Sequence, residues 1–154
     1  MSNRHKPARK AGLTRTGRFT GWESDIDFST FTSTNGKFAE FRTREIIFSV
    51  ELLEPINGER SAKLNVSCYP PNWVKVVNAE ESAGVAKISV FKKTGVEIHA
   101  VVNDDEWTTL LTLTTSGQLA SVRASFDALV RGKAIVQSLR FSTRGAQDLN
   151  QPGE

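Results

Sequence analysis

The chain has 154 residues, 20 Lys and Arg against 17 Asp and Glu, and a formal charge of +3. That length suits one domain with a core of its own, and a single Cys excludes a framework of intramolecular disulfides. The apolar runs fall far short of the roughly 20 residues that a membrane span needs, and the basic start is not followed by the apolar stretch of a signal peptide. We therefore expect a soluble, cytoplasmic protein that does not use a membrane.

The positive charge is concentrated at the N-terminus. Residues 1–18 hold six cations and no acid, whereas residues 19–154 hold 14 cations and all 17 acids. The six cations are Arg4, Lys6, Arg9, Lys10, Arg15 and Arg18. Because Leu13 is the only large apolar residue there apart from Met1, burial cannot offset the entropy of ordering this segment. The sequence predicts a disordered basic arm over 1–18, a single β-rich domain over 19–143 and a flexible C-terminal tail over 144–154.

The first predicted hairpin joins residues 28–31 and 38–41 through a turn at Thr34, Asn35 and Gly36. Its register stays open because aromatic residues fall on both faces. In the second hairpin, residues 46–52 and 62–68 each alternate apolar with polar side chains. A two-residue turn would put the two apolar faces on opposite sides. A three-residue loop at 56–58 pairs Leu52 with Ala62 and Val50 with Leu64, and is the loop that the pattern favours.

A third hairpin is predicted for residues 86–90 and 96–102, with a loop at 93–95 that places Val90 opposite Ile98. Residues 104–116 break the alternation, because apolar side chains recur at helical spacing behind Asp104, Asp105 and Glu106, and Gly117 suits a helix end. This pattern favours a helix. Five Thr between 108 and 115 lower the helix propensity, and a strand is the alternative.

Two later strands are predicted at residues 119–126 and 133–142. About eight strands and at most one helix indicate an all-β fold. We expect an antiparallel β-sandwich with bulged hairpins, and a small β-barrel is the alternative.

The sequence contains no recognised catalytic motif. His5 lies in the arm, His99 is predicted to face outward from its strand, and Cys68 belongs to a predicted core face. One Cys and one ordered His cannot supply the ligands of a zinc site. Asp25 and Asp27 are interpreted as polar edge residues rather than as catalytic carboxylates. We therefore expect no enzyme activity, no catalytic residue, no metal and no cofactor.

Aromatic residues concentrate between positions 19 and 41, with cations interleaved among them. Rings that stack on bases, flanked by cations that follow phosphates, are typical of single-strand nucleic-acid binding. The predicted interface consists of the six arm cations with Phe31, Phe38, Phe41, Arg42 and Arg44. Burial of these rings in a core is the competing interpretation. The functional hypothesis is a non-enzymatic binding module whose basic arm contacts nucleic acid. The alternatives are a structural subunit of a phage or virus-like particle that self-associates, or an inhibitor or adaptor that docks on a protein partner.

Overall fold

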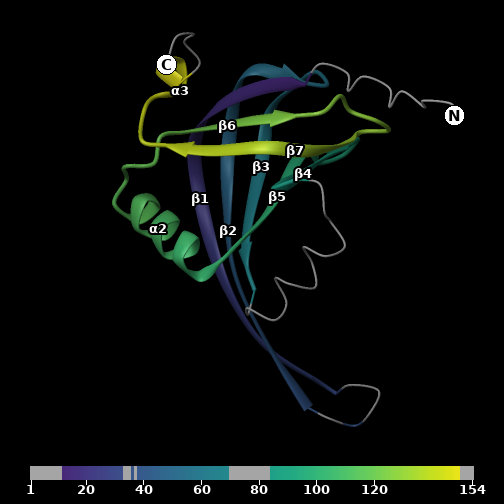
Figure 1. Ribbon diagram of the computed structural model, residues 1–154, viewed down its shortest axis with the longest axis vertical. Coiled ribbons are helices and arrows are strands. Elements are labelled where there is room, and N and C mark those ends of the chain that lie inside the picture. Colours follow the sequence, from purple (N-terminus) through teal and green to yellow (C-terminus); the bar gives the residue numbers. More distant parts are fainter. Residues whose placement is uncertain (1–11, 33–35, 37, 70–83, 150–154) are drawn as a thin grey trace, which may run out of the picture.

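The computed structural model describes residues 12–32, 36, 38–69 and 84–149. Within these ranges the chain forms seven strands and two helices (Figure 1). In chain order they are β1 (Leu13–Thr32), β2 (Phe38–Ile56), β3 (Glu59–Cys68), β4 (Ala86–Phe91), β5 (Gly95–Val102), α2 (Asp104–Thr115), β6 (Ser121–Phe126), β7 (Lys133–Ser142) and α3 (Ala146–Leu149). None of the described helices is long and apolar enough to cross a membrane.

The strands form one closed sheet in the order β1-β2-β3-β5-β4-β7-β6, and β6 returns to pair with β1. The all-β class is thus confirmed, in the form of the small barrel given as the alternative and not as a two-layer sandwich. The pairs are antiparallel except β3 with β5, which run parallel. The predicted strands at 38–41 and 46–52 are one continuous strand, β2.

The core lies inside the barrel and is built from alternate residues of each strand. The two predicted apolar faces, at 46, 48, 50, 52 and at 62, 64, 66, 68, are all buried. Phe19 and Phe141 pack against Phe48, with ring centroids 4.7 and 6.1 Å away. The alternation in the sequence therefore identified the core side of these strands.

The predicted helix is confirmed as α2. Asn103 caps it, accepting a hydrogen bond from the Glu106 backbone N–H at 2.8 Å, while the Glu106 carboxylate accepts from the Asn103 N–H at 3.1 Å. Gly117 follows the helix with a φ of 72°. Trp107 and Leu110 are buried and belong to the barrel core, so α2 is fixed by packing despite its Thr content.

Both predicted hairpin registers are wrong by two residues. Val50 pairs with Ala62, and Val90 pairs with Val96. The β2–β3 turn is the two-residue Asn57-Gly58 turn, with φ values of 50° and 82°, and the sheet is irregular between Glu51 and Ile56. That irregularity places four residues of β2 opposite one of β3, which returns both apolar faces to the same side. The expectation that a regular two-residue turn would put the two apolar faces on opposite sides was correct. The structure avoids this with a bulge in β2 and not with a longer loop.

The ordered strand begins within the range assigned to the arm. β1 pairs with β6 from Leu13 to Arg18, and residues 1–11 lie outside the described part of the chain. At the other end, Ala146 and Leu149 of α3 are buried, within the range assigned to the flexible tail. The described body therefore extends from Leu13 to Leu149, beyond the expected 19–143.

Candidate functional site

Three hairpin turns and the start of β1 meet at one end of the barrel, which we call the turn end (upper right in Figure 1). The turns are at residues 57–58, 92–94 and 131–132. The first two turns are adjacent, because a β-carbon added to Gly95 would lie 3.9 Å from the Glu59 carboxylate. The second and third turns are also adjacent, because the Val90 N–H donates to the Gly132 carbonyl at 2.7 Å. Leu13 pairs with Phe126, the last residue of β6 before the third turn. The arm therefore leaves the barrel beside these turns.

The turn end is rich in unpaired cations. Five exposed basic side chains lie on or next to the three turns, and none forms an ion pair with an acid in the described residues: Arg60, Lys92, Lys93, Arg131 and Lys133. The nearby acids are Glu59 and Asp127, while Glu54 is already matched by Arg15 at 3.5 Å. The turn end is therefore net positive before the arm is counted, and the arm adds four further cations.

The opposite end of the molecule carries a projecting ribbon, residues 20–32 of β1 with 38–49 of β2, which is two-stranded only beyond the pair of Ile26 with Arg44 (bottom of Figure 1). β1 leaves β6 after Arg18, and β2 pairs with β3 only from Arg44 onward. The ribbon carries acids, with Asp25 directly opposite Glu45. The ribbon holds five acids and two Arg in its sequence, so its net charge is −3.

The predicted nucleic-acid interface is divided between these two ends. Arg4, Lys6, Arg9 and Lys10 lie outside the described residues, but their segment joins β1 at the turn end. Phe31 and Phe38 belong to the ribbon, as do Phe41 and Arg42; the backbone register is described there and the side chains are not. Because β1 is extended, positions 13 and 31 are about 60 Å apart along the strand. The start of β1 and the backbone positions of the aromatic cluster therefore lie toward opposite ends of the described barrel.

The three remaining predicted cations, Arg15, Arg18 and Arg44, are engaged within the described fold. Arg15 donates to the Pro55 carbonyl at 3.0 Å, and Arg18 pairs with Glu51 at 2.7 Å. Both contacts join β1 to β2. Because these Arg side chains are already paired or hydrogen-bonded, they attract a polyanion less strongly than the unpaired cations of the turns do.

Arg44 forms a junction between β2, β3 and α2. It pairs with Asp104, donates to the Cys68 sulfur at 3.2 Å and lies 5.6 Å from the centre of the Trp107 ring. Burial and a hydrogen bond to Asp104 raise the pKa of the Cys68 thiol, with Arg44 acting in the opposite direction. A thiol in this state is a poor nucleophile.

His99 is exposed on the outer wall of the barrel, as predicted. Its Nε2 lies 3.3 Å from a Glu97 carboxylate oxygen, and its Nδ1 lies 3.5 Å from the Asn65 amide nitrogen. Asp25 and Asp27 lie on the ribbon and are not near it in the register. Among the described residues no three His, Cys, Asp or Glu side chains are grouped to hold a metal ion.

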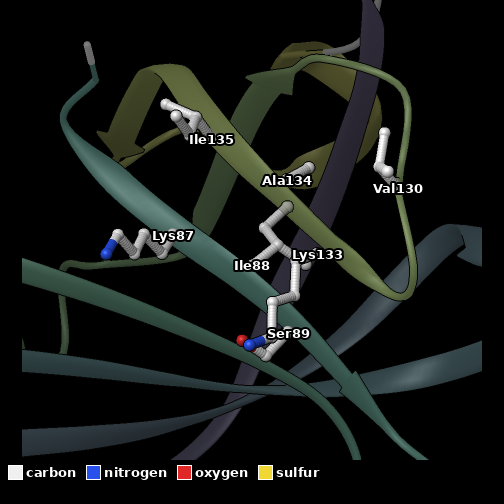
Figure 2. Close-up of a pocket in the computed structure, with 7 residues that line it drawn as sticks. All are labelled: Lys87, Ile88, Ser89, Val130, Lys133, Ala134 and Ile135. Atoms are coloured by element: carbon white, nitrogen blue, oxygen red, sulfur yellow. The ribbon is translucent and has the colours of Figure 1, made fainter. Parts of the chain in front are cut away.

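Among the hollows on the described surface are a smaller one of ≈ 220 Å³, lined by Trp22 and Phe48 with Thr114 of α2, and two larger ones. One of ≈ 340 Å³ lies on β4 and β7 beside the turn end, and Figure 2 shows the residues that line it, among them Lys87, Val130, Lys133 and Ile135. The other, of ≈ 660 Å³, lies between α2 and strands β5 and β7 and is lined mainly by apolar side chains, with Asp105, Glu106 and Arg140. Both are open to the surface.

Comparisons with protein-family models, with curated proteins and with solved structures find no match. The cations of the turn end were missed from the sequence because they are spread over positions 60 to 133. Only the pairing of β3 with β5 and of β4 with β7 brings them together. The Lys92-Lys93 pair before Gly95 was the one local sign of a basic turn.

Proposed function

We propose that the protein is a non-enzymatic binding module that holds nucleic acid at the turn end and with the basic arm. The observation that carries this proposal is the convergence of five unpaired cations from three hairpin turns on the barrel end where the arm begins. Cations so grouped neutralise successive phosphates and release their counterions, which is the main source of affinity for a polyanion.

The charge layout supports binding to the backbone and not to particular bases. The turn cations lie on exposed turns, where they follow phosphates without entering a groove or stacking on bases. The acidic ribbon at the opposite end repels the same ligand. Nucleic acid therefore binds at the end of the barrel, and its sequence has little effect on affinity.

The proposal is tested by fluorescence anisotropy with a labelled single-stranded oligonucleotide between 50 and 300 mM salt. If all four arm cations and all five turn cations contact phosphates, log K against log salt has a slope of about −6. Deletion of residues 1–11 lowers the magnitude of that slope by about 3. Replacement of Lys92, Lys93, Arg131 and Lys133 by Gln lowers it by a similar amount.

A matched control removes cations elsewhere on the barrel. Arg18→Gln with Arg140→Gln changes two exposed Arg residues outside the turn end, and we expect the slope to stay close to that of the unmodified chain. The proposal fails if the arm deletion and the turn variant keep the full slope, or if the unmodified chain does not bind at 50 mM salt.

A further inference from the structure

The hollow in Figure 2 adjoins the third turn of the turn end. It has a volume of ≈ 340 Å³ and lies on β4 and β7. Val130 and Lys133 both line it, and Arg131 and Gly132 form the turn between these two residues. We call it the β4–β7 hollow. It therefore begins directly beside two of the cations that we expect to contact phosphates.

Two apolar side chains of the β4–β7 hollow are open to solvent. Val130 is 70% exposed and Ile135 is 36% exposed, and both line the hollow. Single exposed apolar side chains are common on protein surfaces, but these two share one hollow with Lys133, which forms no ion pair with any acid in the described part of the chain. This combination suits a ligand with a flat apolar face joined to an anion.

The backbone holds this surface in place before a ligand binds. The Val130 N–H donates to the Lys133 carbonyl at 2.8 Å, and the Lys133 N–H donates to the Val130 carbonyl at 3.1 Å. The hydrogen bond from Val90 to the Gly132 carbonyl ties the same turn to β4. Because the backbone of the hollow is already fixed, a ligand loses little affinity to the ordering of this part of the chain.

We propose that the β4–β7 hollow holds one unpaired base of a single-stranded nucleic acid. This inference rests on the function proposed above and names the class of nucleic acid, which is single strands and not duplexes. In a single strand a base can turn away from its neighbours and lay its face on Val130 and Ile135, while Arg131 and Lys133 contact the flanking phosphates. In a duplex the bases are paired and stacked inside the helix, so a base reaches the hollow only at the cost of unpairing.

Charge and size favour a base as the occupant. A neutral apolar ligand would use only the aliphatic side chains, whereas a nucleotide also places an anion near Lys133. The volume of the hollow is at the low end of the roughly 300 to 1,000 Å³ of small-molecule sites, so it suits a single small ring system. Aliphatic side chains contact the face of any base alike, so this contact distinguishes single strands from duplexes without reading the sequence.

The inference is tested by fluorescence anisotropy at 50 mM salt with two labelled strands of equal length. One is an oligothymidine, and the other has the same sugar-phosphate backbone but carries no bases. The unmodified chain should bind the oligothymidine about 5- to 10-fold more tightly, the low end of what stacking of a base on an aromatic ring contributes, because the hollow offers aliphatic side chains and no ring. The salt slopes for the two strands should be equal, because the strands carry the same phosphates.

A hollow variant, Val130→Ser with Ile135→Thr, removes the apolar surface and keeps every charge. It should bind the two strands equally, and its affinity for a duplex should stay within about twofold of that of the unmodified chain. Both positions are exposed, so circular dichroism should show that the variant is folded. The control variant Val85→Ser changes a residue that is 54% exposed outside the hollow, and it should keep the preference for the oligothymidine.

The inference is overturned if the unmodified chain binds the two strands equally, or if the hollow variant keeps the preference. It is also overturned if the hollow variant loses affinity for the duplex by the same factor, since that result assigns the effect to phosphate contacts and not to a base. Failure of the proposed function is a different result, in which the unmodified chain binds no strand at 50 mM salt or the arm and turn changes leave the salt slope unaltered.

Discussion

Replacement of Gly17 by Ala is expected to destabilise the barrel where the sheet closes. Gly17 is buried in β1 between Leu52 of β2 and Val122 of β6. A β-carbon at this position would lie 2.3 Å from Val50 Cγ1 and 3.0 Å from the Glu51 carbonyl oxygen. The carbonyl belongs to the strand backbone and Val50 is 3% exposed in the core, so neither neighbour can move without disturbing its own packing.

The expected loss in free energy of unfolding is about 2 to 3 kcal/mol, at the upper part of the range for overpacked cores. For a domain of this size each kcal/mol lowers the Tm by about 2 to 4 °C, so the Tm should fall by roughly 5 to 10 °C. Urea and thermal unfolding followed by circular dichroism measure both quantities. Gly21→Ala is the matched control on the same strand, because a β-carbon there meets no atom within 4 Å. It should change stability by less than about 0.5 kcal/mol or slightly increase it.

A double variant tests whether the contact itself is responsible. Val50→Ala alone leaves a cavity in the core, but it also removes the Cγ1 atom that the new β-carbon would meet. In the Gly17→Ala background, Val50→Ala should therefore lower the free energy of unfolding by at least about 1 kcal/mol less than it does in the unmodified chain. Equal stability losses for Gly17→Ala and Gly21→Ala, or strictly additive effects in the double variant, would refute the close approach of β1 to β2.

Two further predictions concern α2 and the junction at its start. Because the pKa of the Cys68 thiol is raised above its ordinary value of 9.0 by burial and by the hydrogen bond to Asp104, the associated stability is present below pH 9 and is lost as the pH rises through the folded-state pKa. Urea unfolding of the unmodified chain between pH 7 and 10.5 should show that loss of stability, and the Cys68→Ala variant should not show it. Asp104→Asn removes the hydrogen-bond acceptor that raises the pKa of the thiol, so alkylation of Cys68 at pH 8 should be faster in that variant. Asn103→Ala removes the side-chain acceptor of the capping box and should cost about 1 kcal/mol in urea unfolding, whereas Asn103→Asp should stay within about 0.5 kcal/mol of the unmodified chain.

The parts of the fold that were predicted correctly depend on local patterns. The alternation in 46–52 and 62–68 identifies a buried face without reference to any other strand, and the capping residues of α2 lie within a few positions of one another. β7 begins and ends at the predicted residues for the same reason. Closure of the barrel is different, because it depends on β1 pairing with β6 more than 100 residues away. Nothing in the alternation of either strand specifies that partner.

The register of the hairpins also depends on more than the local pattern. Shifts of two residues keep the same side chains buried, so the apolar pattern does not distinguish between them. Turn chemistry decides the register, and at the β2–β3 hairpin the favoured Asn-Gly turn prevails because a bulge before Ile56 absorbs the mismatch. The apolar pattern of the two strands indicates that the hairpin contains an irregularity, but it does not show at which residues the irregularity lies.

The residues of the predicted interface are separated along the fold for a related reason. Arg15 and Arg18 are close in the sequence to the aromatic cluster, and that closeness suggested one surface. In an extended strand 13 residues span about 43 Å, so sequence neighbours of this kind lie far apart. The cations at 60, 92, 93, 131 and 133 are distant in the sequence, yet hairpin turns bring them to one end of the barrel. In an all-β protein the proximity of functional residues follows strand pairing more than chain order.

The formal charge of +3 therefore describes the molecule poorly. β1 begins among basic turns and continues into an acidic ribbon, so opposite charges are held at opposite ends of one strand. At physiological ionic strength the Debye length is about 8 Å, much shorter than this separation, so the acids of the ribbon are screened from a polyanion bound at the turn end. Because the contact that we propose with nucleic acid is electrostatic, added salt should weaken it.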